Sequence, residues 1–158
     1  LALREAGKAF GLKLFGARAV ESMRMEKGFL HWKADLLTEF SPLETGLTRF
    51  VKLEKEDFIG RAALLDHTPQ KRFVTLTVDA THAPAYGGGS LMDGGRVVGT
   101  ITSGDWGHRT GLNLAYGFVD PDYAAKGTEI QLDLLGDMVT TTVIAPAPYD
   151  PQMSRMRA

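Results

Sequence analysis

Two charged residues, Arg24 and Glu26, alternate with Met23 and Met25 just before Gly28. A period of two is typical of a strand, which would place the arginine and the glutamate on one face and both methionines on the other. Gly28 would then let the backbone turn. A carboxylate and a guanidinium held side by side form either an ion pair on a solvated face, which is individually weak, or part of a ligand site.

The residues before this pair predict the element that leads into it. Ala17, Val20 and Arg24 are spaced for one face of a helix that begins after Gly16, and we expect the helix to give way to the strand at Ser22. Upstream, residues 1–10 predict another helix, which ends at a glycine. The apolar run 12–15 predicts a short strand or a connector.

A helix-capping pattern follows at Ser41-Pro42-Leu43-Glu44. Ser41 can cap a helix, Pro42 suits its first position, and Glu44 can reach back to complete a capping box. We therefore interpret Glu44 as a structural cap, with Gly46 ending the turn. Residues 47–53 predict a strand.

A second short helix is predicted to begin at Asp57, which would cap it. Its apolar residues recur at helical spacing, namely Phe58, Ile59, Ala62 and Leu65. The polar segment 66–72 then predicts a linker between two parts of the chain.

The composition changes after this linker, because 12 of the 18 glycines follow residue 72 at turn-like intervals. Short runs with alternating polarity predict strands, and Asp93-Gly94-Gly95 predicts a hairpin turn between two of them. Such a series is typical of an all-β sandwich or barrel. The predicted strands cover residues 74–78, 91–92, 96–98, 112–119, 129–135 and 138–144.

Two polar glycine-containing segments in this half are interpreted as structural. Gly87-Gly88-Gly89-Ser90 lacks the lysine and the following helix of a phosphate-binding loop, so we predict a flexible turn. Thr102-Ser103-Gly104 predicts a turn between two strands. In the segment after it, Trp106 and Arg109 are the side chains that could reach a partner domain.

Composition excludes several classes of function. The 158 residues carry a net charge of -1, which gives no reason to expect nucleic acid or a membrane surface as a partner. No apolar run is long enough to span a bilayer. The chain has no cysteine, which fits a reducing compartment, and we expect a cytoplasmic protein. Its four histidines never fall at ligand spacing, so we expect no metal site.

A longer motif surrounds the first charged pair, and it resembles a known family. The run G-A-R-A-V-E-S-M-R-M-E-K-G, residues 16–28, is similar to the folate-binding signature of the aminomethyltransferase (glycine cleavage T-protein) family. Its E-K-G and H-W forms resemble the C-terminal, folate-binding region of dimethylglycine and sarcosine dehydrogenases most. The similarity continues through His31-Trp32, Asp35-Leu36, Pro42-Leu43-Glu44, Gly46-Leu47, Lys55, Asp57-Phe58, Gly60-Arg61 and Ala63-Leu64.

The resemblance implies an α+β fold in two parts with a tail. Residues 1–68 would be the C-terminal portion of the family's folate-binding domain, an α/β piece. Residues 73–148 would form its small C-terminal antiparallel β-barrel, and residues 149–158 a tail that folds back towards the ligand.

The resemblance also implies a set of folate-binding residues. Glu26 would accept hydrogen bonds from the exocyclic amine and the ring N–H of a reduced pterin, and Arg24 would hold that carboxylate ionised and oriented. Trp32 is either a core aromatic or a wall against the flat ring. Lys55 stands where the family has arginine, so it offers a point charge for the glutamate tail of folate. Tyr149 and Arg155 are possible contacts from the tail.

The implied reaction is transfer of a one-carbon unit to tetrahydrofolate, giving 5,10-methylenetetrahydrofolate. The family's catalytic aspartate lies upstream of this motif, so we assign no catalytic residue and expect the chain alone to be inactive. It begins with Leu1, which suggests a piece of a longer protein whose N-terminal region is its partner. Three alternatives stay open: the end of a flavoprotein demethylase with FAD bound upstream, the end of a stand-alone aminomethyltransferase, and a non-catalytic folate-binding module.

Overall fold

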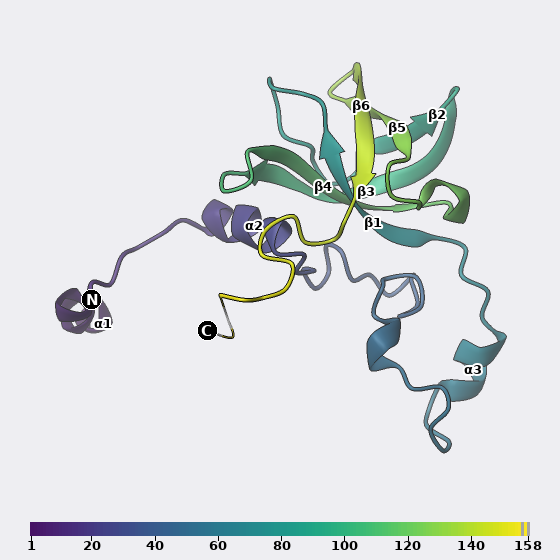
Figure 1. The fold of residues 1–158 in the computed structure, drawn as a ribbon, viewed down its shortest axis with the longest axis horizontal. Coiled ribbons are helices and arrows are strands. Elements are labelled where there is room, and N and C mark those ends of the chain that lie inside the picture. The colour runs from purple at the N-terminus through teal and green to yellow at the C-terminus, as the bar shows by residue number, and fades with distance from the viewer. Residues whose placement is uncertain (156, 158) are drawn as a thin grey trace.

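The computed structural model describes residues 1–155 and 157 (Figure 1). A six-stranded barrel forms its larger part, and the first 71 residues form helices and turns beside it. The fold is therefore mixed α+β. The helical elements of the first part are α1 (Ala2–Gly7), η1 (Lys8–Phe10), α2 (Ala17–Glu26), η2 (Thr48–Phe50) and α3 (Arg61–Asp66).

The barrel closes on itself in the order β1-β4-β3-β2-β5-β6, and every pair of neighbouring strands is antiparallel. Closure leaves no unpaired sheet edge. A short 3-10 helix, η3 (Pro121–Tyr123), follows β4. The strands are β1 (Arg72–Val78), β2 (Ser90–Asp93), β3 (Arg96–Gly107), β4 (Leu112–Val119), β5 (Glu129–Leu134) and β6 (Asp137–Ile144).

The alternation read from the sequence explains the barrel core. Val74, Leu76 and Val78 of β1 point inwards, and Leu76 is fully buried. They pack against inward residues of the other five strands, including Leu91 and Leu132. The barrel and its hairpin at Gly94-Gly95, where both glycines have positive φ, are confirmed.

Helix α2 packs on the outside of the barrel at β3 and β4 (Figure 1). Met25 is fully buried against Leu114 and Tyr116, and the Tyr116 hydroxyl donates to the Met25 carbonyl oxygen at 2.7 Å. Burial raises the pKa of the Tyr116 hydroxyl, so it stays a donor. This contact fixes the end of α2 that carries the charged motif.

The strand predicted from Ser22 is wrong, because residues 17–26 form one continuous helix. Ser22, Met25 and Glu26 are buried together, which is the i, i+3, i+4 spacing of a helix face, while Met23 is exposed. Arg24 and Glu26 consequently do not share a face. The buried face of this helix is largely polar, so the sequence shows no helical period of apolar residues. The alternation of methionines with charged residues therefore resembled the pattern of a strand.

Three further expectations of local structure are wrong. Residues 47–53 contain the 3-10 turn η2 (Thr48–Phe50) and no strand. Residues 12–15 are a connector, which was one of the two predicted alternatives. Helix α3 begins later than predicted, because Gly60 with φ 91° takes the N-cap position in place of Asp57. Thr102-Ser103-Gly104 lies within β3, where the register shifts against β4. The α/β piece thus has no strand within the described residues before Arg72, only an isolated bridge.

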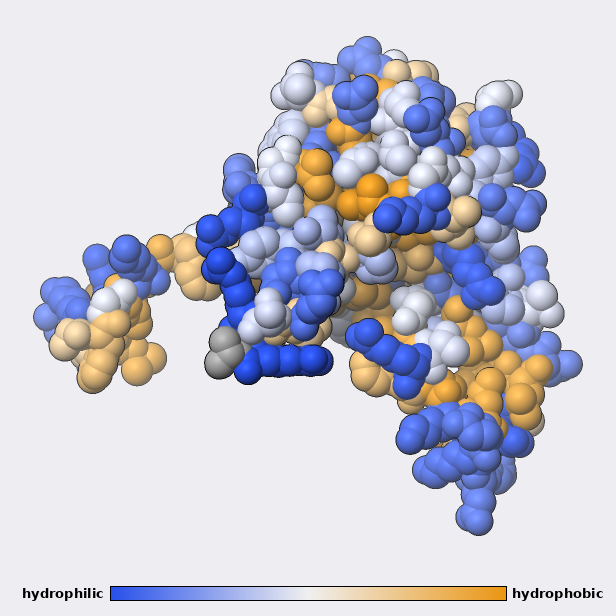
Figure 2. All heavy atoms as spheres, in the orientation of Figure 1, coloured by the Kyte–Doolittle hydropathy of each residue, from blue (hydrophilic) through white to orange (hydrophobic). Residues whose placement is uncertain are grey.

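The N-terminal arm, residues 1–15, projects away from the rest of the molecule (Figure 1), and Figure 2 shows apolar atoms exposed along it. No residue of α1 is buried. Among the described residues, no helix combines the length and the apolar character needed to cross a bilayer.

Candidate functional site

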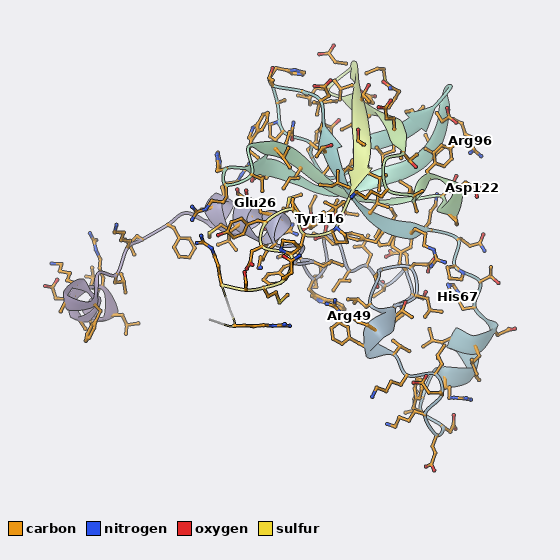
Figure 3. All side chains as sticks on the ribbon, in the orientation of Figure 1. Glu26, Arg49, His67, Arg96, Tyr116 and Asp122 are labelled. Atoms are coloured by element: carbon orange, nitrogen blue, oxygen red, sulfur yellow. The ribbon has the colours of Figure 1, made fainter. Side chains whose placement is uncertain are left out.

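The cleft beside α2 brings together a buried carboxylate and several cations. It has a volume of about 580 Å³, which lies within the range of small-molecule sites. We call it the Glu26 cleft, and Figure 3 shows Glu26 at the junction of α2 with the barrel. Its walls come from α2, from the turn between β3 and β4, and from the C-terminal tail: Ala19, Ser22, Met23, Glu26, Lys27, His108, Arg109 and Tyr149.

The carboxylate of Glu26 is held by the turn between β3 and β4. Its Oε1 accepts the backbone N–H groups of Arg109 and Thr110, both at 2.7 Å, and faces the Thr110 hydroxyl at 3.0 Å. The Glu26 residue is only 3% exposed. Successive backbone N–H groups that converge in this way form an anion-binding nest.

Two glycines allow this turn to lie close to the carboxylate. Gly111, with φ 71°, closes the turn by donating its N–H to the Gly107 carbonyl oxygen at 2.7 Å. A Cβ on Gly107 would lie 2.5 Å from the Thr110 hydroxyl oxygen and 3.0 Å from Glu26 Oε1. The close approach of Glu26 to the turn therefore requires glycine at position 107.

The second carboxylate oxygen of Glu26 is available to a ligand. All three hydrogen-bond donors reach Oε1, and Oε2 has no partner among the described residues. No fully buried side-chain oxygen or nitrogen of those residues lacks a partner, so Oε2 keeps access to the cleft. The arrangement can therefore accept hydrogen bonds from a ligand at one fixed point.

Arg24 is elsewhere, in a buried network with Asp35. Its Nη1 donates to Asp35 at 2.7 Å, its Nη2 donates to Ser103 at 2.9 Å, and its Nε donates to Glu21 at 2.8 Å. Burial lowers the pKa of Arg24, but the Glu21 and Asp35 carboxylates outweigh this and hold the pKa above its ordinary value. The network joins α2 to β3, and it does not orient Glu26 as the sequence had suggested.

Asp35 is the centre of that network, and the sequence marked it only as part of the family similarity, without a role. It is fully buried. Besides Arg24, it accepts the His31 N–H at 2.8 Å and the hydroxyls of Thr102 and Ser103 at 2.6 and 2.7 Å. It therefore binds the loop after α2 to β3 as well as to α2.

The C-terminal tail folds back onto the Glu26 cleft. The Tyr149 N–H donates to the Glu26 carbonyl oxygen at 2.9 Å, and Lys27 forms an ion pair with Asp150 at 2.8 Å. The Lys27 hydrogen bond, followed by that of Ser154, lowers the pKa of Asp150 to about 2. Of the two predicted tail residues, Tyr149 thus contacts Glu26, and Arg155 lies against the Tyr149 ring.

Three cations surround the Tyr149 ring. Lys27 Nζ lies 6.0 Å from the ring centroid, and the Cζ atoms of Arg109 and Arg155 lie 5.7 and 5.9 Å from it. Each distance is in the range of a cation–π contact. The rim of the Glu26 cleft therefore carries Arg109 and, beside Tyr149, Arg155, while Asp150 offsets the charge of Lys27.

The other two predicted site residues lie outside this cleft. Trp32 is 63% exposed in the loop after α2, with an isolated bridge to Leu36. Lys55 is exposed in the segment between η2 and α3, which Figure 1 shows apart from α2. Neither lines the Glu26 cleft.

Glu44 acts as a structural cap, as predicted from its sequence. Its Oε2 accepts the N–H and the hydroxyl of Ser41, both at 2.9 Å. Its Oε1 accepts the N–H groups of Gln70 and Lys71, at 3.0 and 3.1 Å, so it also ties the linker to this turn. Burial raises the pKa of Glu44, but these four hydrogen bonds outweigh it and bring the pKa from 4.5 to about 2.

Residues that the sequence did not mark for this site are Lys27, His108 and Thr110. Lys27 is part of the E-K-G motif, but its place in the cleft depends on a tail more than 120 residues away. Thr110 lies 84 residues from Glu26. In the sequence, the glycines on both sides of this turn, Gly107 and Gly111, are the only local feature that could indicate an anion-binding nest.

Comparison with protein families gives two matches along the chain. Residues 71–150 match the glycine cleavage T-protein C-terminal barrel domain, and residues 1–55 match the GCVT N-terminal domain. The chain belongs to the glycine cleavage T-protein family. The closed barrel and the helix that carries the E-K-G motif are thus features of a family member.

Relatives of two kinds have similar sequences. Dimethylglycine dehydrogenase of Mus musculus is 34% identical over 90% of this chain and 17% of its own length. Sarcosine dehydrogenase of the same species is 34% identical over 99% of this chain and 18% of its own length. An aminomethyltransferase of Streptomyces coelicolor is 36% identical over 96% of this chain and 42% of its own length.

A solved structure confirms the fold. The glycine cleavage system aminomethyltransferase T from Bartonella henselae superposes with a TM-score of 0.81 at 28% identity, over 89% of this chain and 40% of the other. The chain therefore spans under half the length of the aminomethyltransferases and under a fifth of the dehydrogenases that it matches.

Proposed function

We propose that this chain is the folate-binding part of a tetrahydrofolate-dependent one-carbon transferase. Family membership supports a folate-dependent transferase domain. The observation that carries the assignment to a site is the carboxylate of Glu26, held rigidly in a cleft with Oε2 available. Glu26 also stands at the position of the E-K-G motif to which the resemblance assigns pterin binding.

The chemistry of the cleft fits a reduced folate. The exocyclic amine and the ring N–H of a pterin are donors, and an anionic oxygen is the acceptor that they prefer. Arg109 and Arg155 lie at the rim beside Tyr149, where they would offset the negative glutamate tail, whereas Lys27 is already paired with Asp150. The two arginines are better placed for that role than Lys55, which lies outside the cleft.

In the proposed reaction, N5 of tetrahydrofolate takes up a one-carbon unit that comes from an amine substrate, and the product is 5,10-methylenetetrahydrofolate. The part played by this chain is to bind and orient the pterin. We assign no catalytic residue to it, and we expect residues outside this chain to complete the site.

We place the chain at the end of a dimethylglycine or sarcosine dehydrogenase-like flavoprotein, with FAD bound by a part of the protein outside it. The size of the native gene product distinguishes the alternatives. A product of which this chain makes up about 17–18%, and which contains bound flavin, would agree with this assignment. A product of which it makes up about 42%, without flavin, would favour a stand-alone aminomethyltransferase. A native product of 158 residues would leave a non-catalytic folate-binding module.

Calorimetric titration with 5-formyltetrahydrofolate, a stable reduced folate, tests the binding function. We expect saturable binding, and Glu26→Gln should raise the Kd at least about tenfold, because a hydrogen bond to a charged group contributes about 1.5–3 kcal/mol. Glu129→Gln, an exposed change on β5, is the matched control and should leave the Kd unchanged. Absence of binding by the wild type, or equal Kd values for both variants, would overturn the proposal.

A further inference from the structure

The turn between β3 and β4, residues 107–111, has a role in recognition beyond closing the hairpin. We infer that this turn occupies Oε1 of Glu26 completely, so that the ligand is recognised through Oε2 alone, and that Thr110 is a positioning residue for this purpose. The inference rests on the proposed function, because it specifies how the same carboxylate meets the pterin.

The first step concerns the capacity of Oε1. A carboxylate oxygen offers about two lone-pair sites. Two backbone N–H groups donate to Oε1 at 2.7 Å and fill both sites. The Thr110 hydroxyl stands 3.0 Å from Oε1 and 3.2 Å from the Gly107 carbonyl oxygen, so its single proton is donated to that carbonyl and stabilises the turn around the carboxylate. No capacity is left for a ligand at this oxygen. A fork-like contact with one donor on each carboxylate oxygen, as an arginine makes, is therefore not available in the Glu26 cleft.

The second step concerns the rigidity of the turn relative to α2. Ser22 lies one helical turn before Glu26, and its hydroxyl donates to the Trp106 carbonyl oxygen. Arg18, a further turn back, pairs with Asp105 at 3.0 Å, although its own side chain is largely exposed. Successive turns of α2 are thus attached to the end of β3. These contacts fix the turn that forms the nest relative to the helix that carries Glu26.

The third step is the consequence for recognition. With Oε1 occupied, both donors of a ligand edge must converge on Oε2, which can accept two hydrogen bonds. The cleft then selects ligands whose donors are adjacent. A ligand with an acceptor at that edge would face an anionic oxygen and be rejected. Thr110 contributes by keeping the carboxylate plane fixed within the nest.

Binding of 5-formyltetrahydrofolate to two variants of Thr110 in the full chain tests the positioning role. Thr110→Val removes the hydroxyl but keeps the shape of the side chain, and it should raise the Kd about three- to tenfold, within the range of one hydrogen bond. Thr110→Ser restores the hydroxyl and should bind within about twofold of the wild type. Thr81→Val, at an exposed threonine, should change nothing. Equal affinity of Thr110→Val and the wild type would overturn the role of Thr110.

A measurement without ligand separates this inference from the proposed function. Amide protons that donate to a carboxylate resonate downfield, so the N–H signals of Arg109 and Thr110 should be downfield in the wild type and move upfield in Glu26→Ala. Glu26→Gln should keep them hydrogen-bonded through its amide oxygen, which turns the amide nitrogen towards the ligand and explains the loss of binding. If the wild type failed to bind folate, the proposed function would fall. If these amide signals did not respond to Glu26→Ala, the inference would fall.

Discussion

At the scale of single residues, the buried carboxylates of Asp35, Glu44 and Glu26 differ in how many of their oxygen atoms have hydrogen-bond partners. Asp35 is saturated by Arg24, a backbone N–H and two hydroxyls, so it only holds structure. Glu44 uses both oxygens as a cap. Glu26 alone of these three leaves one oxygen without a partner among the described residues, and the ligand role that we propose for it rests on this difference.

Glu44 makes acid stability a test of the capping role. Its pKa is about 2 in the folded chain against 4.5 ordinarily, so its ionised form stabilises the fold above pH 4.5, and this contribution is lost as the pH falls towards about 2. Glu44→Gln cannot titrate, so its free energy of unfolding should decline less steeply between those pH values. At pH 7 it should be lower than that of the wild type by about 1–3 kcal/mol. Urea unfolding at pH 7, 5 and 3 measures this, and parallel curves would contradict it.

Gly107 tests the fit between Glu26 and its turn. Gly107→Ala would place a Cβ against the Thr110 hydroxyl and Glu26 Oε1, so it should expel the carboxylate from the nest and weaken folate binding about tenfold or more. Gly16→Ala is a matched control, because a Cβ there meets nothing within 4 Å. Calorimetry on both variants checks this, and equal losses of affinity would show that the tight approach is unimportant.

At the scale of elements, the strands could be predicted and helix α2 only in part. Alternation marks β1 and β5, and glycine turns separate β2 from β3 and β5 from β6, so local sequence predicts most of the strands. It does not predict that β3 continues to Gly107. Helix α2 buries Ser22, Arg24 and Glu26, whose partners are supplied by β3 and by the turn after it. A polar face that becomes buried through distant partners leaves no apolar period in the sequence, and for this reason the second half of α2 was mistaken for a strand.

The Arg24–Asp35 pair should be a strong anchor of α2 on the barrel, beside the contacts of Met25 and Ser22. Asp35→Ala leaves a buried arginine with little compensation, so it should lower the free energy of unfolding by about 3–5 kcal/mol. Glu21→Ala removes the other carboxylate of the same arginine, but Glu21 is 38% exposed and should cost about 1 kcal/mol or less. Chemical denaturation of both variants gives the comparison. Similar costs would mean that Asp35 is not a strong anchor.

At the scale of the whole molecule, a closed barrel carries a site that is built mainly from segments outside it. The barrel supplies the nest for Glu26, while α2 supplies the carboxylate and the tail supplies Tyr149 and Arg155. The sequence predicted the barrel, and the resemblance named Glu26, Tyr149 and Arg155 as candidates, of which Glu26 and Tyr149 line the cleft. It could not predict the nest, because Thr110 and Glu26 meet only after α2 has docked.

The N-terminal arm should be dispensable for stability. No residue of α1 is buried, whereas Leu76 is fully buried in the barrel. Deletion of residues 1–15 should therefore change Tm by less than about 2 °C, while Leu76→Ala should cost about 2–5 kcal/mol. Thermal denaturation of both variants is the measurement. A large loss of stability on deletion would show that the arm packs on the rest of the chain.

A crystal structure of the chain with 5-formyltetrahydrofolate tests the central claim most directly. The account predicts the pterin in the Glu26 cleft, with its exocyclic amine and adjacent ring N–H on Oε2 and with Oε1 still held by the N–H groups of Arg109 and Thr110. A pterin bound elsewhere on the molecule, or one bound in the cleft without contact to Glu26, would contradict it.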